Sequence, residues 1–262
     1  MQYKIKKIFR AVQKQRLKLT EMPFQILESR MALEKGREQK IPKNVYQTFK
    51  FNSFGKTHFE EISKFRELNR DFDFIFFDEG AQNTWIENNW FGTKILSIYK
   101  NLKFGPARAD IFRYCILYTQ GGYYFDISKG CRVPLTSLHD EECECLISFE
   151  QKDVFISPDR QIFNILKYPE KYILQWGFGF SSGHPFLKKT IDNIELDYHL
   201  YKGRKFENPK TAILMFTGPG QFTKSVRRVL LDYPDLSITQ AGIDFNRQGI
   251  FAMKGSEARY LL

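Results

Sequence analysis

The sequence predicts an α/β fold in which helices cover both faces of a mostly parallel or mixed β-sheet. From Ile41 onward, short β-rich runs alternate with segments whose apolar residues recur at helical spacing. The length of 262 residues suits one such domain, and 26 phenylalanines supply ample material for a packed core. The protein should therefore be globular, and in such sheets ligands bind beyond the carboxyl ends of the strands.

The first half of the domain is predicted to open with a strand, a helix and a second strand. Runs rich in β-branched and aromatic residues predict strands at 41–49, 71–79 and 122–128, and the second of these ends in acids. Helical spacing of apolar residues predicts helices at 57–69, around 81–100 and at 107–120.

In the second half, strands are expected at 144–149 and within 175–182. A polar stretch containing Pro158 and Pro169 predicts a long loop between them. Two further helices are expected, at 184–200 and at 218–233, and the second is entered through glycines.

Residues 1–38 are predicted to form a basic amphipathic helical segment preceding the domain at 39–262. Ile5, Ile8, Phe9 and Val12 share helical spacing among seven basic residues. Two interpretations stay open, because such a helix lies on anionic lipid or docks its apolar stripe on its own domain. The formal charge of +10 favours an anionic partner: nucleic acid, an acidic membrane face or a phosphorylated small molecule.

No apolar run approaches the roughly 20 residues that span a bilayer, and the start lacks the core of a signal peptide. We therefore expect a cytoplasmic protein, peripheral at the inner membrane face if the basic helix binds lipid. The four cysteines show neither zinc-ligand spacing nor a disulfide pattern, so reduced thiols are expected.

The chemistry is expected around the segment GGYYFDIS, where an apolar strand runs into Asp126 and Ser128. Asp110 and Arg113 lie three residues apart and project from one helix face. Alone, such a pair is most often an ordinary surface ion pair. The glycine turn at 121–122 brings the chain back, however, so that this pair and Asp126 are expected to share one cleft.

Four segments, in this order and spacing, resemble the sugar-transferring domain of glycosyltransferase family 32: IPKNVYQTFK, PARADIFRYCILYTQGGYYFDIS, WGFGFSSGHPFL and TGPGQFT. The family includes fungal Golgi mannosyltransferases and bacterial capsule and lipopolysaccharide enzymes. The resemblance runs from about Ile41 to about Thr223 and implies a single GT-A-type domain. It also implies a retaining enzyme that moves a hexose from a nucleotide sugar.

At matching positions, the resemblance implies three catalytic residues: Asp110, Arg113 and Asp126. The resemblance implies that Asp110 holds donor-sugar hydroxyls beside the cation Arg113. It implies that Asp126, the first acid of an Asp-X-Asp motif, binds the ribose and a divalent cation. Further donor-binding positions are Phe49, which would stack on the base, and Arg108, Thr217 and Gly218.

The segment Thr217-Gly218-Pro219-Gly220 precedes a helix, where backbone N–H groups favour an anion; a plain helix-entry turn is the alternative. Trp176 and Gly177 are expected near the donor or acceptor pocket by family position alone.

The metal site departs from the family pattern, because Ser128 replaces the second acid of the motif. Hard oxygen ligands suit Mn²⁺ or Mg²⁺, and a hydroxyl is a weaker ligand than a carboxylate. Three arrangements stay open: Ser128 still ligates the metal, Asp244 completes the shell, or Lys129 and nearby cations replace part of the metal's role.

The expected function is glycosyl transfer to a glycan or lipid-linked acceptor in bacterial surface polysaccharide synthesis. One alternative is a catalytically silent scaffold of the same fold, which Ser128 keeps open. The other is a basic nucleic-acid-binding module, but most aromatic residues fall in core patterns, so no nucleic-acid partner is expected.

Overall fold

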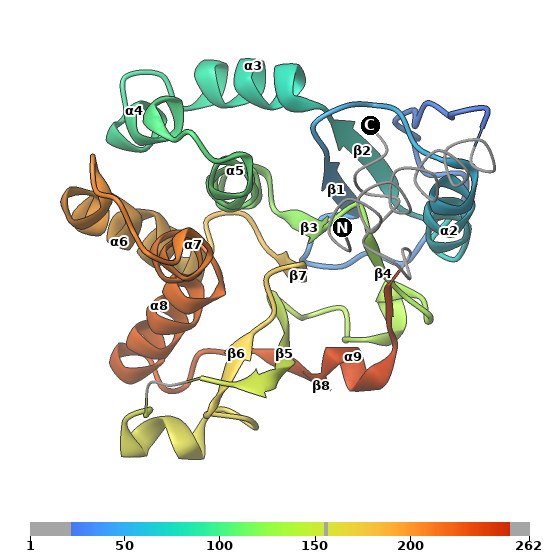
Figure 1. Ribbon diagram of the computed structural model, residues 1–262. Helices are drawn as coiled ribbons and strands as arrows, with labels where there is room; N and C mark the ends of the chain where they lie inside the picture. Colours follow the sequence, from blue (N-terminus) through green and yellow to red (C-terminus); the bar gives the residue numbers. More distant parts are fainter. Residues whose placement is uncertain (1–21, 155–156, 252–262) are drawn as a thin grey trace, which may run out of the picture.

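A mixed β-sheet forms the centre of the computed structural model, which describes residues 22–154 and 157–251 (Figure 1). The strand order is β2-β1-β3-β7-β5-β6, and β8 also pairs with β5. The strands are β1 (Asn44–Thr48), β2 (Asp73–Phe77), β3 (Gly122–Phe125), β5 (Cys145–Asp153), β6 (Lys171–Ile173), β7 (Gly177–Phe180) and β8 (Thr239–Ile243).

The sheet joins a parallel part to a largely antiparallel part. β1 pairs in parallel with both β2 and β3, whereas β7 is antiparallel to β3 and to β5. β5 is antiparallel to β6 and parallel to β8. The predicted mixed α/β fold is therefore confirmed, and the carboxyl ends of β1 and β3 meet at one edge of the sheet.

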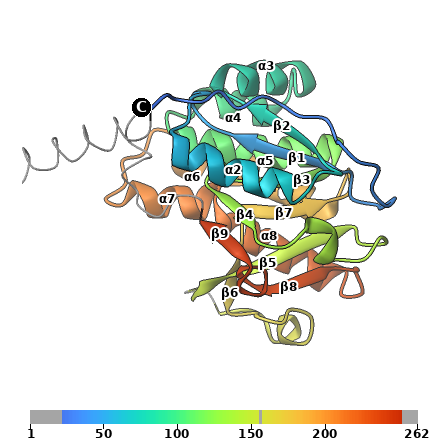
Figure 2. The ribbon, with the colours of Figure 1, turned by 90° about the vertical axis from the view of Figure 1, so that its right-hand side faces the viewer.

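Helices cover both faces of this sheet (Figures 1 and 2). The helices are α2 (Lys56–Glu67), α3 (Glu79–Asn89), α4 (Lys94–Asn101), α5 (Gly105–Gln120), α6 (Pro185–Tyr201), α7 (Pro209–Phe216), α8 (Pro219–Asp232) and the short α9 (Asp244–Arg247). In Figure 1, α2 lies on one side of the sheet, and α5 to α8 lie on the other. Short 3-10 helices occur at Leu135–Ser137 and Arg160–Asn164, and β4 (Lys129–Cys131) pairs with β9 (Gly249–Phe251).

The core consists of two main apolar clusters, one on each face of the sheet. The larger cluster joins the sheet to α4, α5, α6 and α8, and the smaller one joins it to α2, β4 and the segment after β8. Most of α5 is buried because this helix lies between the sheet and α6. Side chains on α5 are thus held rigidly.

Two glycines make the turn from α5 into β3. Gly121 ends the helix with φ 66°, and Gly122 follows with φ 101°, a backbone region that disfavours other residues. A Cβ on Gly122 would also lie 2.6 Å from the carbonyl oxygen of Asn44 in β1. This tight reversal returns the chain antiparallel to α5, so the start of α5 and the end of β3 lie at the same edge.

The N-terminal segment differs from its prediction. Residues 22–38 form no helix; instead they make isolated bridges from Gln25 to Phe54 and from Arg30 to Phe74. The Arg30 guanidinium lies 5.1 Å from the centroid of the Phe74 ring, so the segment is fixed to α2 and β2 by specific contacts rather than by a helical stripe. The rest of the predicted basic helix, residues 1–21, lies outside the described residues.

Within the described ranges, none of the helices is long and apolar enough to cross a membrane.

Candidate active site

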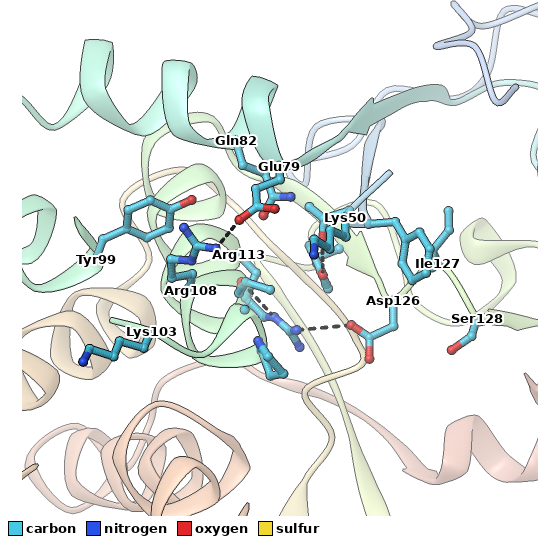
Figure 3. Close-up of a pocket in the computed structure, with 16 residues that line it drawn as sticks. Lys50, Glu79, Gln82, Tyr99, Lys103, Arg108, Arg113, Asp126, Ile127 and Ser128 are labelled. Carbon is cyan, nitrogen blue, oxygen red and sulfur yellow. Dashed lines mark hydrogen bonds and ion pairs between the residues drawn. The ribbon is translucent and has the colours of Figure 1, made fainter. Parts of the chain in front are cut away.

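A cleft of about 640 Å³ opens where β1 and β3 end and where α3 and α5 begin (Figure 3). Its lining includes the end of β1 with Phe49, the turn after β3, and the first turns of α3 and α5. The charged residues in the lining are Lys50, Glu79, Lys103, Arg108, Arg113 and Asp126. The cleft therefore lies at the sheet edge where a ligand was expected from the sequence. Its basic residues outnumber its acidic residues.

Arg113 occupies the floor of the cleft and is fixed on every side. Its Nη1 donates to the carbonyl of Gln175 at 2.6 Å, and its Cζ lies 4.4 Å from the centroid of the Tyr124 ring. Its Nη2 lies 3.2 Å from Asp126 Oδ1 and 3.3 Å from Asp110 Oδ1. Burial lowers the pKa of Arg113, but the surrounding acidic groups outweigh this and raise it above its ordinary value. Arg113 is thus a rigid, permanent cation.

Asp110 lies behind Arg113 rather than on the cleft surface. The residue is buried, and Oδ2 accepts a hydrogen bond of 2.9 Å from the hydroxyl of Thr217. Burial raises the pKa of Asp110 to about 6, although Arg113 and the Thr217 hydroxyl favour the charged form. The structure thus brings Asp110 and Arg113 together as predicted, but the direct contact of Asp110 with a donor sugar stays a prediction.

Asp126 faces the cleft from the turn that follows β3. Its side chain is 36% exposed, and Oδ1 makes the contact with Arg113. The backbone is fixed on both sides: its N–H donates to the carbonyl of Trp176, and its carbonyl accepts from the N–H of Lys129. The carboxylate is therefore held in place while it stays accessible to a ligand.

Asp126 and Ser128 are the residues that would hold a divalent cation. Ser128 is buried and also lines the cleft. Across the part of the chain that the structure describes, no three His, Cys, Asp or Glu residues are grouped so as to hold a metal ion. A carboxylate and a hydroxyl fit Mg²⁺ or Mn²⁺ when phosphate oxygens and water supply the other ligands, which is common for Mg²⁺ sites.

An ion pair between Glu79 and Arg108 lies across the cleft and was not predicted from the sequence. Glu79 begins α3 directly after Asp78, whose side chain caps the helix by accepting from the N–H of Ala81 at 2.8 Å. Asp78 and Glu79 are the two acids that end the second predicted strand, so the sequence did contain a signal for the Glu79 carboxylate. Arg108 lies in the cleft, as predicted for a donor-binding residue.

Lys50 and Lys103 were also missed. Lys50 follows Phe49 at the end of β1, and Lys103 lies in the short connection from α4 to α5. Both are exposed and line the cleft. No motif marks such lysines, because their role depends only on where two loops meet.

Phe49 lies at the cleft and is half-buried, with its ring centroid 5.6 Å from that of Phe54. This position suits a stacking role, and base stacking on Phe49 stays a prediction.

The Thr217-Gly218 segment is not the open anion site that its helix-entry sequence suggested. The N–H groups of Thr217 and Gly218 both donate to the carbonyl of Ile213 in α7, at 3.0 and 2.9 Å. Neither residue is in the cleft lining. These two amides are already used by α7, and the Thr217 hydroxyl donates to Asp110. Donor binding by Thr217 and Gly218 stays a prediction.

Trp176 and Asp244 lie outside the cleft lining. The Trp176 ring packs against Phe125 and Phe245, and the ammonium of Lys129 lies 5.0 Å from its centroid. Gly177 is in β7, where an added Cβ would lie 2.8 Å from the Phe125 ring. Ligation of a metal by Asp244 stays a prediction.

The mixed sheet, with a cleft at its strand ends, has the arrangement expected of a GT-A-type fold. Residues 55–144 match the family described as "Glycosyltransferase sugar-binding region containing DXD motif". The match covers about a third of the chain, and it confirms the resemblance to glycosyltransferase family 32.

Curated relatives of the chain are fungal mannosyltransferases. The chain is 26% identical over 184 residues to inositol phosphoceramide mannosyltransferase 3 of Schizosaccharomyces pombe, a match that covers 68% of this chain and 43% of the relative. It is 26% identical over 205 residues to the initiation-specific alpha-1,6-mannosyltransferase of Candida albicans, which covers 71% of this chain and 52% of the relative. The chain thus spans about half the length of these relatives.

Among solved structures, the PaToxG glycosyltransferase aligns with a TM-score of 0.53 at 13% identity. The alignment covers 87% of this chain and 81% of that one, and it supports the fold alone.

Proposed function

We propose that this protein is a hexosyltransferase that moves a sugar from a nucleotide-sugar donor to a glycan or lipid-linked acceptor. The observation that carries the proposal is the fixed position of Arg113 between Asp110 and Asp126 on the floor of a cationic cleft. The match of residues 55–144 to the glycosyltransferase family model supports the same reaction class.

The cleft suits a leaving group that gains negative charge. As a glycosidic bond to a nucleoside diphosphate breaks, the diphosphate becomes more anionic, and cations preorganised in a partly dry site stabilise it. Arg113 is fixed before the donor binds, whereas Lys50 and Lys103 are exposed and can follow the phosphates. Asp126 and Ser128 would hold Mn²⁺ or Mg²⁺, which when bound neutralises diphosphate charge.

Asp110 acts on this chemistry through Arg113. Because Asp110 is buried and its Oδ2 is engaged by Thr217, its Oδ1 fixes the guanidinium from behind while Asp126 approaches from the cleft side. We assign Asp110 as a positioning residue and Asp126 as a residue that touches the donor.

Retention of configuration is the stereochemical course that the family resemblance implies. The carboxylates lining the cleft, Glu79 and Asp126, are both engaged by arginines, so neither is well placed as a covalent nucleophile. This favours a same-face reaction in which the departing diphosphate helps to deprotonate the acceptor hydroxyl.

The relatives support a choice of donor sugar, but they do not support the expected bacterial setting of the reaction. Both named relatives are mannosyltransferases, and one carries inositol phosphoceramide in its name, so mannose is the first donor sugar to test and a lipid-linked acceptor is a reasonable class. These relatives are fungal and lend no support to a bacterial surface polysaccharide. That setting and the cytoplasmic location stay predictions.

Thermal unfolding of the purified chain with UDP, GDP, CMP and their sugars, each with and without Mn²⁺, tests the proposal. A ligand at about 100 times its Kd stabilises by about 2.7 kcal/mol. For a domain of this size that raises Tm by roughly 5 to 11 °C, at about 2 to 4 °C per kcal/mol. A shift with one nucleotide family is expected, and no shift with any of them would contradict the proposal.

A catalytically silent scaffold of the same fold is the second candidate, and the replacement of an acid by Ser128 is the observation that favours it. A scaffold would bind a nucleotide sugar without releasing a nucleoside diphosphate. Product release measured on the same samples separates the two candidates.

A further inference from the structure

We infer that the end of α6, the loop 202–208 and α7 form a docking surface for an anionic membrane. We call this surface the α6–α7 hairpin. The two helices pack against each other and lie side by side in Figures 1 and 2. The inference concerns where the protein binds and is separate from the residues proposed for sugar transfer.

The hairpin concentrates exposed positive charge. Its basic side chains are Lys202, Arg204, Lys205 and Lys210, and these four are exposed. Its acids are the exposed Glu207 in the loop and, beside Leu196 on α6, the half-buried Glu195 and Asp197, of which Asp197 pairs with Lys224. Across the described ranges none of the four basic residues forms an ion pair, although many other surface cations of the chain do, so this charge is available to an external anionic partner.

Apolar side chains are exposed beside these cations. Leu196 and Leu200, four residues apart on α6, are 66% and 43% exposed, and Phe206 in the loop is 38% exposed. In α7, with the sequence PKTAILMF, Phe216 is the one buried side chain, while Ile213, Leu214 and Met215 are only half-buried. A basic surface that also exposes aliphatic and aromatic groups is typical of segments that lie in the interface of a bilayer.

Lipid fits this composition better than nucleic acid does. A surface that binds single-stranded nucleic acid offers aromatic faces on which bases stack. Here the most exposed apolar groups are leucines, and the Phe206 ring is already packed against Tyr201, with centroids 5.5 Å apart. Aliphatic groups instead partition into the acyl boundary while the cations contact lipid phosphates.

The residue that follows the hairpin forms a hydrogen bond to Asp110 in the proposed active site. Thr217 directly follows α7, and its hydroxyl donates to Asp110 behind the cleft floor. α7 has eight residues and is thus about 12 Å long, so the basic loop lies about one short helix from this contact. A membrane bound to the hairpin would therefore lie close to the cleft, which suits a membrane-borne acceptor if the proposed function holds.

Flotation of the full chain with phosphatidylcholine vesicles, with or without about 30% phosphatidylserine, tests the inference. Binding is expected only with phosphatidylserine and should weaken at high salt. Each lysine or arginine near such a surface contributes roughly fivefold to partitioning. Replacing all four hairpin cations by Gln should therefore lower partitioning by about 100-fold or more, and Leu200→Ser with Phe206→Ser by about 10-fold.

Matched variants keep the test specific. Replacing Lys35, Lys64, Lys152 and Arg160 by Gln removes the same charge from exposed sites outside the hairpin, and Phe91→Ser removes an aromatic ring that is 87% exposed elsewhere. Both controls should bind vesicles within about threefold of wild type.

Three results would overturn the inference. The first is no binding to anionic vesicles, and the second is an equal loss in the hairpin variant and its charge control. The third is a hairpin variant that loses binding to a single-stranded RNA but retains vesicle binding. Circular dichroism of each variant shows whether it is folded, and nucleotide-induced thermal shifts report the donor site independently.

Discussion

The Thr217 hydroxyl lies 2.9 Å from Asp110 Oδ2 and so links the end of α7 to the buried face of α5, 107 residues earlier in the chain. The Thr217 carbonyl is also an anchor, since it accepts from the Tyr114 hydroxyl at 2.9 Å and from the Gln175 amide at 3.1 Å. Gln175 in turn accepts from Arg113 through its own carbonyl. Thr217 is therefore part of the support that holds the cationic centre of the cleft.

Thr217→Val should destabilise the protein by about 1 to 3 kcal/mol, because the buried Asp110 Oδ2 loses its donor without any change in side-chain size. Urea unfolding at neutral pH measures this cost. Thr217→Ser, which keeps the hydroxyl, should recover most of the stability. Equal losses in the two variants would mean that the methyl group matters and the hydrogen bond does not.

The pH dependence of the unfolding free energy should reveal the titration of Asp110. Burial raises its pKa to about 6 in the folded protein, from an ordinary value of 3.8. The folded state therefore binds the proton more tightly, so this contribution to stability is fully present below pH 3.8 and is lost as the pH rises through about 6. Relative to Asp110→Asn, the wild type should lose up to about 3 kcal/mol of unfolding free energy between pH 4 and pH 7.

Urea unfolding of both proteins across this pH range makes the comparison. Asp192→Asn, which removes an exposed carboxylate paired with Lys188, should follow the wild type. A constant difference between wild type and Asp110→Asn would show that Asp110 does not titrate in this range.

The pair of Glu79 and Arg108 should tune affinity for a nucleoside diphosphate. Glu79→Gln removes a negative charge from the cleft and releases Arg108, so diphosphate affinity should rise by about three- to tenfold at low salt. Arg108→Gln should lower it by about tenfold. Isothermal titration calorimetry with the nucleotide found by thermal unfolding measures both.

Glu87→Gln provides the control for that pair, because Glu87 lies on the same helix, pairs with Lys100 and is not in the cleft lining. An effect of Glu87→Gln as large as that of Glu79→Gln would point to the net charge of the protein instead of the cleft.

Ser128→Asp should strengthen the metal site. The change restores a second carboxylate beside Asp126, so Mn²⁺ affinity in the presence of the nucleoside diphosphate should rise at least about tenfold. The electron paramagnetic resonance signal of free Mn²⁺ measures binding without any need for turnover. Unchanged affinity would show that residue 128 does not face the cation.

The sequence was enough to predict the features that depend on local pattern. The spacing of Asp110 and Arg113 on one helix, the glycine turn after it and the acid at the end of β3 each follow from a few adjacent residues. Together they correctly predicted that these three side chains meet at one sheet edge.

The features that the sequence analysis missed depend on contacts between distant segments. The hydroxyl of Thr217 reaches Asp110 only because the residue that ends α7 lies against α5, and Glu79 meets Arg108 only because α3 and α5 begin at the same edge. The segment 22–38 has helix-compatible residues, yet bridges such as that of Arg30 to β2 outweigh its local preference. Packing of this kind has no signature in a single sequence.

The most direct test of the proposed function is release of nucleoside diphosphate from nucleotide mannose and nucleotide glucose donors by wild type, Asp126→Ala and Asp192→Ala. Wild type and the exposed-site control Asp192→Ala should turn over one donor at similar rates, and Asp126→Ala should lose at least about 100-fold in kcat, since a removed charge-stabilising group typically costs this much. Turnover by Asp126→Ala at the wild-type rate, with thermal unfolding showing all three proteins folded, would contradict the assignment of this cleft as the active site.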